Sequence, residues 1–137
     1  FGDPETEVVL PLLGSDLYEI LMACATGSLD DVDIQWSSDA AVTVVMASRG
    51  YPFSRSEPAP IAGIDAAVAS GCMVFHAGTA TGDGEVVTAG GRVLAVTALR
   101  PTLVAAADAA HEGVALISFD GAQHRADIAR ATAEAHP

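Results

Sequence analysis

The hydrophobic pattern of the first part of the chain indicates two short helices separated by Gly14. The first helix is expected over residues 4–12, and Gly27 ends the second. Ser15 and Asp16 are suited to cap the second helix. The apolar stripes consist of Val8, Val9, Leu12 and Leu13 in the first helix and Leu17, Ile20, Leu21 and Cys24 in the second.

From Ile34 onward the pattern changes to short apolar runs rich in β-branched residues, which predict strands. Asp83-Gly84 joins two extended runs and therefore predicts a hairpin, whereas Gly90-Gly91 predicts a sharp bend. Residues 50–60 contain three prolines and are expected to form an irregular surface loop. The expected strands are 41–46 and 72–75, both buried, followed by 85–88, 92–99 and a short last strand at 117–119.

Three more helical segments are expected among these strands. They are a single turn at 65–70, a helix that starts at Pro101-Thr102 and is closed by Gly113, and a terminal helix at 127–135. Short strands joined by hairpins, with helices at both ends, predict an α+β fold with a mainly antiparallel sheet. We expect residues 1–137 to form a single domain.

Charge and cysteine content narrow the classes of partner. The formal net charge is −12, with 18 acidic residues against six arginines and no lysine. A nucleic acid or an anionic membrane surface needs a basic face, so we expect neither as a partner. Cys24 and Cys72 lie in apolar contexts without CxxC spacing. They are expected to be buried free thiols, which favours a cytoplasmic location.

Short motifs for phosphate, metal or hydrolase chemistry are absent from the sequence. A P-loop requires a lysine, and the patterns HExxH, CxxC and GxSxG do not occur either. The P-loop, metalloprotease, zinc-ribbon and α/β-hydrolase interpretations therefore have no support. Four polar spots remain as candidates, and none of them names a function by itself.

The first candidate is the stretch Phe1-Gly2-Asp3-Pro4-Glu5-Thr6, which holds two carboxylates within three residues. Its features are those of a helix start. Asp3 can cap the helix, Pro4 suits the first helical position, and Glu5 favours the positive end of the helix dipole. This structural role is the ordinary interpretation of an Asp-Pro-Glu sequence.

The other three candidates each carry a structural and a functional interpretation. His76 follows an apolar strand and is either a hydrogen-bonded structural group or a residue that a substrate reaches. Gly90-Gly91-Arg92 is either a plain hairpin bend with a solvated arginine or a close backbone approach to a phosphate or carboxylate. Arg125-Ala126-Asp127 is most simply a surface ion pair or a helix cap.

Five motifs occur in a fixed order along the chain. They are FGDPET at 1–6, GYP at 50–52, VFHAGT at 74–79, VTAGGRVLAVTA at 87–98 and RADI at 125–128. In this order and spacing they resemble the C-terminal domain of phosphoribosylamine–glycine ligases, also called glycinamide ribonucleotide synthetases. The resemblance extends from Phe1 to about Ile128, and FGDPET together with TAGGRVL is highly specific.

The resemblance implies an ATP-grasp ligase of de novo purine biosynthesis. Such an enzyme uses ATP and Mg²⁺ to phosphorylate the carboxylate of glycine, and the amine of 5-phosphoribosylamine attacks the acyl phosphate to form glycinamide ribonucleotide. The family's magnesium-binding glutamate and asparagine, and an arginine directly before the motif, would precede Phe1. The N-terminal and ATP-grasp domains would also lie outside this chain. We therefore expect no metal ligand and no bound ATP or Mg²⁺ here, and no activity from these 137 residues alone.

The resemblance further implies that the chain forms one wall of the substrate pocket. Asp3 would bind or orient the substrate amine, and Glu5 would support that loop or contact magnesium-bound water, which makes these two the predicted catalytic residues. The predicted substrate-binding residues, which would line or brace the pocket, are His76, Thr79, Gly90, Gly91 and Arg92. Among these, Arg92 is the residue expected to meet an anion.

The sequence also departs from the family pattern. Glu7 stands where Gln or Met is usual, which bears on the positioning of the neighbouring motif, and the loop 50–60 and Leu99-Arg100-Pro101 differ as well. An alternative is a free-standing, non-catalytic binding or oligomerisation module with the same fold. A reading frame that continues upstream through an ATP-grasp domain would support the enzyme, and a start codon close to Phe1 would support the module.

Overall fold

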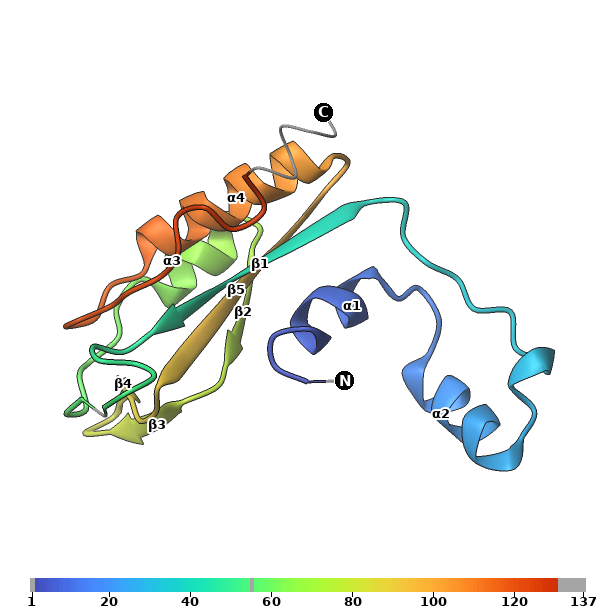
Figure 1. Cartoon of the computed structure of the whole chain (residues 1–137), viewed down its shortest axis with the longest axis horizontal. Helices are drawn as coiled ribbons and strands as arrows, with labels where there is room; N and C mark the ends of the chain where they lie inside the picture. Colours follow the sequence, from blue (N-terminus) through green and yellow to red (C-terminus); the bar gives the residue numbers. More distant parts are fainter. Residues whose placement is uncertain (1, 55, 131–137) are drawn as a thin grey trace.

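The computed structural model describes residues 2–54 and 56–130 (Figure 1). At its centre is a three-stranded sheet in which β5 lies between β1 and β2, and both pairings are antiparallel. The three strands are β1 (Ala40–Ala47), β2 (Met73–His76) and β5 (Arg92–Arg100). The strands predicted at 41–46, 72–75 and 92–99 are therefore confirmed to within one residue at each end. The prediction that the second of them is buried is wrong, because β2 lies at the edge of the sheet, where Met73 and His76 are exposed and Val74 and Phe75 are half-buried.

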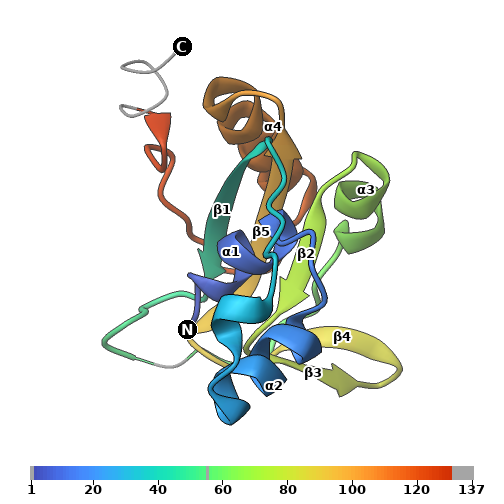
Figure 2. The same cartoon turned by 90° about the vertical axis from the view of Figure 1, so that its right-hand side faces the viewer.

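Helices cover both faces of this sheet (Figures 1 and 2). Helix α1 (Thr6–Leu12) packs on one face, against β1 and β5, and α4 (Leu103–Leu116) packs on the other. The short helix α3 (Ile64–Ala69) lies beside α4 and β2. Because β5 is covered on both faces, its residues 93–98 are all buried. The predicted α+β class with a mainly antiparallel sheet is confirmed.

Helix α4 shows how packing overrides a local stop signal. Thr102 caps it as expected, since its Oγ1 accepts a hydrogen bond from the backbone N–H of Ala105 at 3.2 Å. The prediction that Gly113 ends the helix is wrong, because α4 continues to Leu116. A Cβ atom at Gly113 would lie 2.6 Å from Sγ of Cys72, so this glycine lets the helix approach the sheet closely.

A two-stranded hairpin lies beside the central sheet, formed by β3 (Thr79–Gly82) and β4 (Glu85–Thr88). Its turn residues Asp83 and Gly84 have φ values of 50° and 84°, which are typical of a type I′ turn. This hairpin is confirmed. The alternative of a hairpin bend at Gly90-Gly91 is wrong, because β4 pairs with β3 whereas β5 pairs with β1 and β2.

The N-terminal segment carries a helix that stands apart from the sheet (Figure 1). Helix α2 (Leu17–Thr26) begins after Asp16, whose Oδ1 accepts from the backbone N–H of Tyr18 at 2.7 Å, and ends at Gly27 with φ 73°. It is followed by a 3₁₀ turn, η1 (Leu29–Asp31). Both ends of α2 agree with the prediction, but its apolar stripe is not buried in this structure.

The two cysteines differ accordingly. Cys24, on α2, is exposed, so the prediction of a buried thiol is wrong there, whereas Cys72 is buried against α4 as expected.

Toward the C-terminus, the strand predicted at 117–119 is reduced to a single bridge between Ala62 and Ser118. The predicted helix at 127–135 extends beyond the described residues, and its described part begins as a turn. No described helix is long and apolar enough to cross a membrane.

Three loops that carry candidate site residues meet at one end of the central sheet. The register pairs Ala47 at the end of β1 with Arg92 at the start of β5, and His76 at the end of β2 with Leu94. The segments that follow β1 and β2 and the segment that precedes β5 therefore emerge together. This end of the sheet holds most of the candidate residues.

Candidate functional site

Arg92 is the centre of a polar cluster at this end of the sheet. Its Nε donates a hydrogen bond to Oδ2 of Asp3 at 3.0 Å, and its Nη1 donates to the hydroxyl oxygen of Tyr51 at 3.1 Å. Asp3 precedes α1, and Tyr51 lies in the loop after β1. Three segments that are far apart in the sequence therefore meet at one guanidinium group.

The position of Asp3 corrects the prediction that it caps the first helix. Helix α1 begins at Thr6, its N-cap residue is Glu5, and no side chain makes a capping hydrogen bond there. Pro4 precedes the helix and does not occupy its first position. The local motif suggested a cap, but the carboxylate of Asp3 is engaged by Arg92 instead.

The electrostatics of the cluster favour a charged arginine. The pKa of Arg92 is raised above its ordinary value, chiefly by the hydrogen bond to Tyr51. The hydrogen bond to Asp3 and the negative charge of Asp3 add to this effect. The side chains of Arg92 and Asp3 are 44% and 33% exposed, so solvent screens their attraction. Such a partly exposed pair contributes little to stability. Its main effect is to fix the orientation of both groups.

Three glycines bring the backbone close to this cluster. A Cβ atom at Gly78 would lie 2.5 Å from the carbonyl oxygen of Arg92, and one at Gly91 would lie 2.5 Å from Cδ2 of Tyr51. Gly90 is held by Ser48, whose hydroxyl donates to the carbonyl oxygen of Gly90 at 2.9 Å. Larger side chains at these positions would displace the loop or the tyrosine ring.

The cluster lines an open hollow of about 440 Å³. An arginine has five N–H groups, of which Arg92 uses two within the described part of the chain, so the remaining N–H groups can bind an anion. The other carboxylate oxygen of Asp3 can accept a hydrogen bond from an amine. The lining residues are Asp3, Tyr51, Ala77, Gly78, Gly91 and Arg92. The site can therefore hold a small molecule that carries an amine next to an anionic group.

Not all of the predicted site residues meet in this hollow. Nδ1 of His76 lies 3.0 Å from Oγ1 of Thr79, and His76 lines a different hollow, between α3 and β4. Gly90 lines another small hollow with Thr88 and Ser56. Glu5 is exposed and does not line the hollow around Arg92. The substrate-binding role of His76 and the catalytic role of Glu5 stay predictions.

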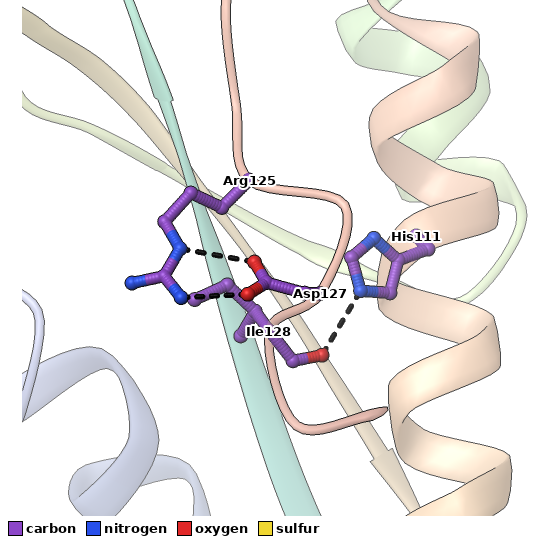
Figure 3. A network of polar contacts seen from close by, with 4 residues as sticks. All are labelled: His111, Arg125, Asp127 and Ile128. Carbon is purple, nitrogen blue, oxygen red and sulfur yellow. Dashed lines mark hydrogen bonds and ion pairs between the residues drawn. The ribbon is translucent and has the colours of Figure 1, made fainter. Parts of the chain in front are cut away.

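Figure 3 shows a second ion pair, between Arg125 and Asp127. Arg125 also lines a further hollow. Nε and Nη2 of Arg125 donate to the two carboxylate oxygens of Asp127 at 2.9 and 2.7 Å, so the surface ion pair predicted for these residues is present. Arg125 holds the pKa of Asp127 below its ordinary value, and Asp127 raises that of Arg125. Next to them, Nε2 of His111 lies 3.1 Å from the carbonyl oxygen of Ile128, which ties this segment to α4.

Sequence reasoning missed Tyr51 as a site residue. Its ring packs on Gly91 and its hydroxyl binds Arg92, so it orients the predicted anion-binding group. The Gly-Tyr-Pro motif at 50–52 was a signal for it, but nothing in the local sequence shows that this loop reaches the start of β5. Within residues 2–54 and 56–130, no three His, Cys, Asp or Glu side chains gather to hold a metal ion.

Comparisons with known proteins converge on one family. The family described as phosphoribosylglycinamide synthetase, C domain, matches residues 41–131. The phosphoribosylamine–glycine ligase of Streptomyces coelicolor is 50% identical over 98% of this chain, which corresponds to 33% of that protein. The human trifunctional purine biosynthetic protein adenosine-3 is 50% identical over 93% of this chain and 13% of its own length.

A solved structure shows the same fold. The crystal structure of the phosphoribosylamine–glycine ligase from Thermotoga maritima superposes with a TM-score of 0.71 at 31% sequence identity. The match covers 93% of this chain and 31% of the Thermotoga chain. The chain thus spans about a third or less of the length of these relatives.

Proposed function

Because the chain belongs to the family of phosphoribosylglycinamide synthetase C domains, we propose that it forms one wall of the substrate site of a phosphoribosylamine–glycine ligase. Such a ligase joins glycine to 5-phosphoribosylamine at the expense of ATP, in purine biosynthesis. The observation that carries the proposal is the Asp3–Arg92–Tyr51 cluster, which presents a carboxylate and a guanidinium side by side to an open hollow.

The chemistry of the cluster suits these substrates. The carboxylate of Asp3 binds and orients an amine, which fixes the direction from which the amine attacks. Arg92 binds an anionic group through the N–H groups that face away from Asp3 and Tyr51. Tyr51 keeps the guanidinium in place through its hydroxyl. Each of these roles is a matter of positioning, and none requires proton transfer by this chain.

ATP and Mg²⁺ do not fit the described residues. The described chain lacks a cluster of three potential metal ligands, and the sequence lacks any lysine for a phosphate-binding loop. We therefore place both groups on other parts of a longer protein, where the N-terminal and ATP-grasp domains would lie. The exposed apolar side chains of Tyr18, Leu21 and Met22 on α2 support this arrangement, because a neighbouring part of the same protein can cover them.

The test is an assay of ADP release with the full-length protein that contains this chain. Release should require both glycine and 5-phosphoribosylamine. The 137 residues by themselves should show no turnover, since we place the ATP site on other parts of a longer protein. Turnover by the isolated chain would contradict the proposal. So would a full-length protein whose rate of ADP release does not depend on glycine or does not depend on 5-phosphoribosylamine. A free-standing product without ligase activity would support the binding-module alternative.

A further inference from the structure

Helix α1 carries a proline in its last turn, and this proline leaves one backbone carbonyl without its usual helical partner. In a regular α-helix, the carbonyl oxygen of Glu7 would accept a hydrogen bond from the backbone N–H of residue 11. That residue is Pro11, which has no N–H. The carbonyl of Glu7 therefore has to find its donor outside the regular hydrogen-bond ladder of the helix.

Two threonines of the central sheet reach this carbonyl. Thr43 of β1 and Thr97 of β5 lie directly opposite each other in the sheet. Oγ1 of Thr97 lies 3.0 Å from the carbonyl oxygen of Glu7, and Oγ1 of Thr43 lies 3.2 Å from it. The two hydroxyls are also within hydrogen-bond distance of each other. Each hydroxyl has one proton, so the shorter contact assigns the bond to Glu7 to Thr97, and Thr43 can donate to Thr97.

Helix α1 has little else to fix its position on the sheet. It is only seven residues long, no side chain caps its N-terminus, and none of its residues is fully buried. A helix of this length is not stable by itself in water. Its apolar contacts with β1 and β5 are non-directional (Figure 2). A directional hydrogen bond from the sheet therefore sets how α1 sits on the two strands.

The position of α1 in turn determines the position of Asp3. The backbone N–H of Thr6, the first residue of α1, donates to the carbonyl oxygen of Gly2 at 2.8 Å. Asp3 lies inside the turn that this hydrogen bond closes, and from there its carboxylate meets Arg92. Thr97 is fully buried and lines none of the hollows described above, so it can act on a reaction in the site only through α1.

We propose that Thr97 is a positioning residue for the ligase reaction. Its hydroxyl binds the carbonyl that Pro11 leaves without a helical partner, and so holds Asp3 in place for the substrate amine. Thr43 supports this contact by donating to the hydroxyl oxygen of Thr97. The inference rests on the proposed ligase function. It predicts that a buried residue of the sheet, which cannot touch a substrate, affects turnover through one backbone carbonyl.

The test compares Thr97→Val with Thr97→Ser in the full-length protein. Valine keeps the branched shape and removes the hydroxyl, whereas serine keeps the hydroxyl. Thr97→Val should lower kcat about tenfold, because a misplaced carboxylate orients the amine poorly, and Thr97→Ser should recover most of that loss. The matched control is Thr102→Ala, which removes the hydroxyl that caps α4. This control should lose stability and keep the wild-type kcat.

Two further readouts separate positioning from a general loss of stability. Asp3→Asn should lower kcat by a smaller factor in the Thr97→Val background than in the wild type, because both changes act through the same carboxylate. Hydrogen exchange measured by mass spectrometry should show the amides of α1 exchanging about tenfold faster in Thr97→Val, with those of α4 unchanged.

A folded Thr97→Val variant with wild-type kcat would overturn the inference, as would an equal effect of Asp3→Asn in the two backgrounds. If Thr97→Val does not fold, Thr43→Val decides: a smaller loss of kcat with faster exchange in α1 supports the inference, and wild-type values overturn it. If the wild-type protein shows no ligase activity, the proposed function fails. The exchange rate of α1 then decides the role of Thr97 by itself, since faster exchange in Thr97→Val supports it and unchanged exchange overturns it.

Discussion

Nε of Arg92 lies 3.0 Å from Oδ2 of Asp3, although 89 positions separate the two residues in the sequence. The contact joins the segment before α1 to the first residue of the central strand β5. Tyr51 completes the arrangement from a third segment. The candidate site is therefore assembled by the fold and not by any single motif, and the predictions below follow from that geometry.

Gly91→Ala should disturb the site through Tyr51. The new methyl group would lie 2.5 Å from Cδ2 of the tyrosine ring, so the ring must move and its hydrogen bond to Arg92 would be lost. We expect kcat/KM of the full-length ligase to fall about tenfold, the effect of losing one well-oriented contact.

The matched control is Gly84→Ala, in the turn of the β3–β4 hairpin. Its φ of 84° makes alanine strained by about 1–2 kcal/mol, but no atom lies within 4 Å of the added Cβ. This variant should lose stability and keep its activity. Equal activity losses in the two variants would show that glycine strain, and not the tyrosine contact, explains the effect.

The carboxyl group of Asp127 should titrate below its ordinary pKa, because Arg125 stabilises its charged form. Since the folded pKa is lowered, the stabilisation is present above the ordinary pKa and is lost as the pH falls through the lower, folded value. Arg125→Ala should return the pKa of Asp127 toward its ordinary value. An NMR titration of the side-chain carboxyl measures this, and an unchanged pKa would rule out the ion pair.

Thiol labelling should distinguish the two cysteines of the 137-residue chain. Cys24 is exposed on α2, whereas Cys72 is buried under α4 with its Sγ 3.4 Å from the carbonyl oxygen of Ala109. A thiol reagent should therefore modify Cys24 quickly and Cys72 only on unfolding. Mass spectrometry of the labelled peptides gives both rates. Similar rates at the two sites would contradict either the exposure of Cys24 on α2 or the burial of Cys72 under α4.

Val44→Ala should act on stability alone. Val44 is fully buried in β1, next to β5 and under α4, so removing its methyl groups leaves a cavity. We expect the free energy of unfolding to fall by about 1–3 kcal/mol. Urea denaturation of the chain measures the loss, and the same variant of the full-length protein should keep a normal kcat per folded molecule.

Much of the fold was predictable because its signals are local. Asp16 and Gly27 bound α2, Thr102 caps α4, and Asp83-Gly84 forms the hairpin turn, each through contacts within a few residues. The predicted strands followed from apolar runs, which reflect burial on both faces of β5. The identity of the family followed from the order of five motifs and agrees with the comparisons.

The predictions from the sequence were wrong where contacts between residues far apart in the chain determine the local structure. Gly113 looked like a helix end, but its lack of a side chain lets Cys72 pack against α4. Asp3 looked like a helix cap, but Arg92 takes its carboxylate. For the same reason the pattern could not find Tyr51, or show that His76 faces a different hollow from Arg92.

The most direct test of the account is a double-mutant cycle of Asp3→Asn and Arg92→Ala in the full-length ligase. Asp3→Asn should lower kcat about 10- to 100-fold, because the amine loses its orienting carboxylate, and the double variant should lose less than the sum of the two single effects. The midpoint of urea unfolding should change little, because both side chains of the ion pair are partly exposed. A variant Asp3→Asn that unfolds the protein while its folded fraction keeps full activity would contradict the account.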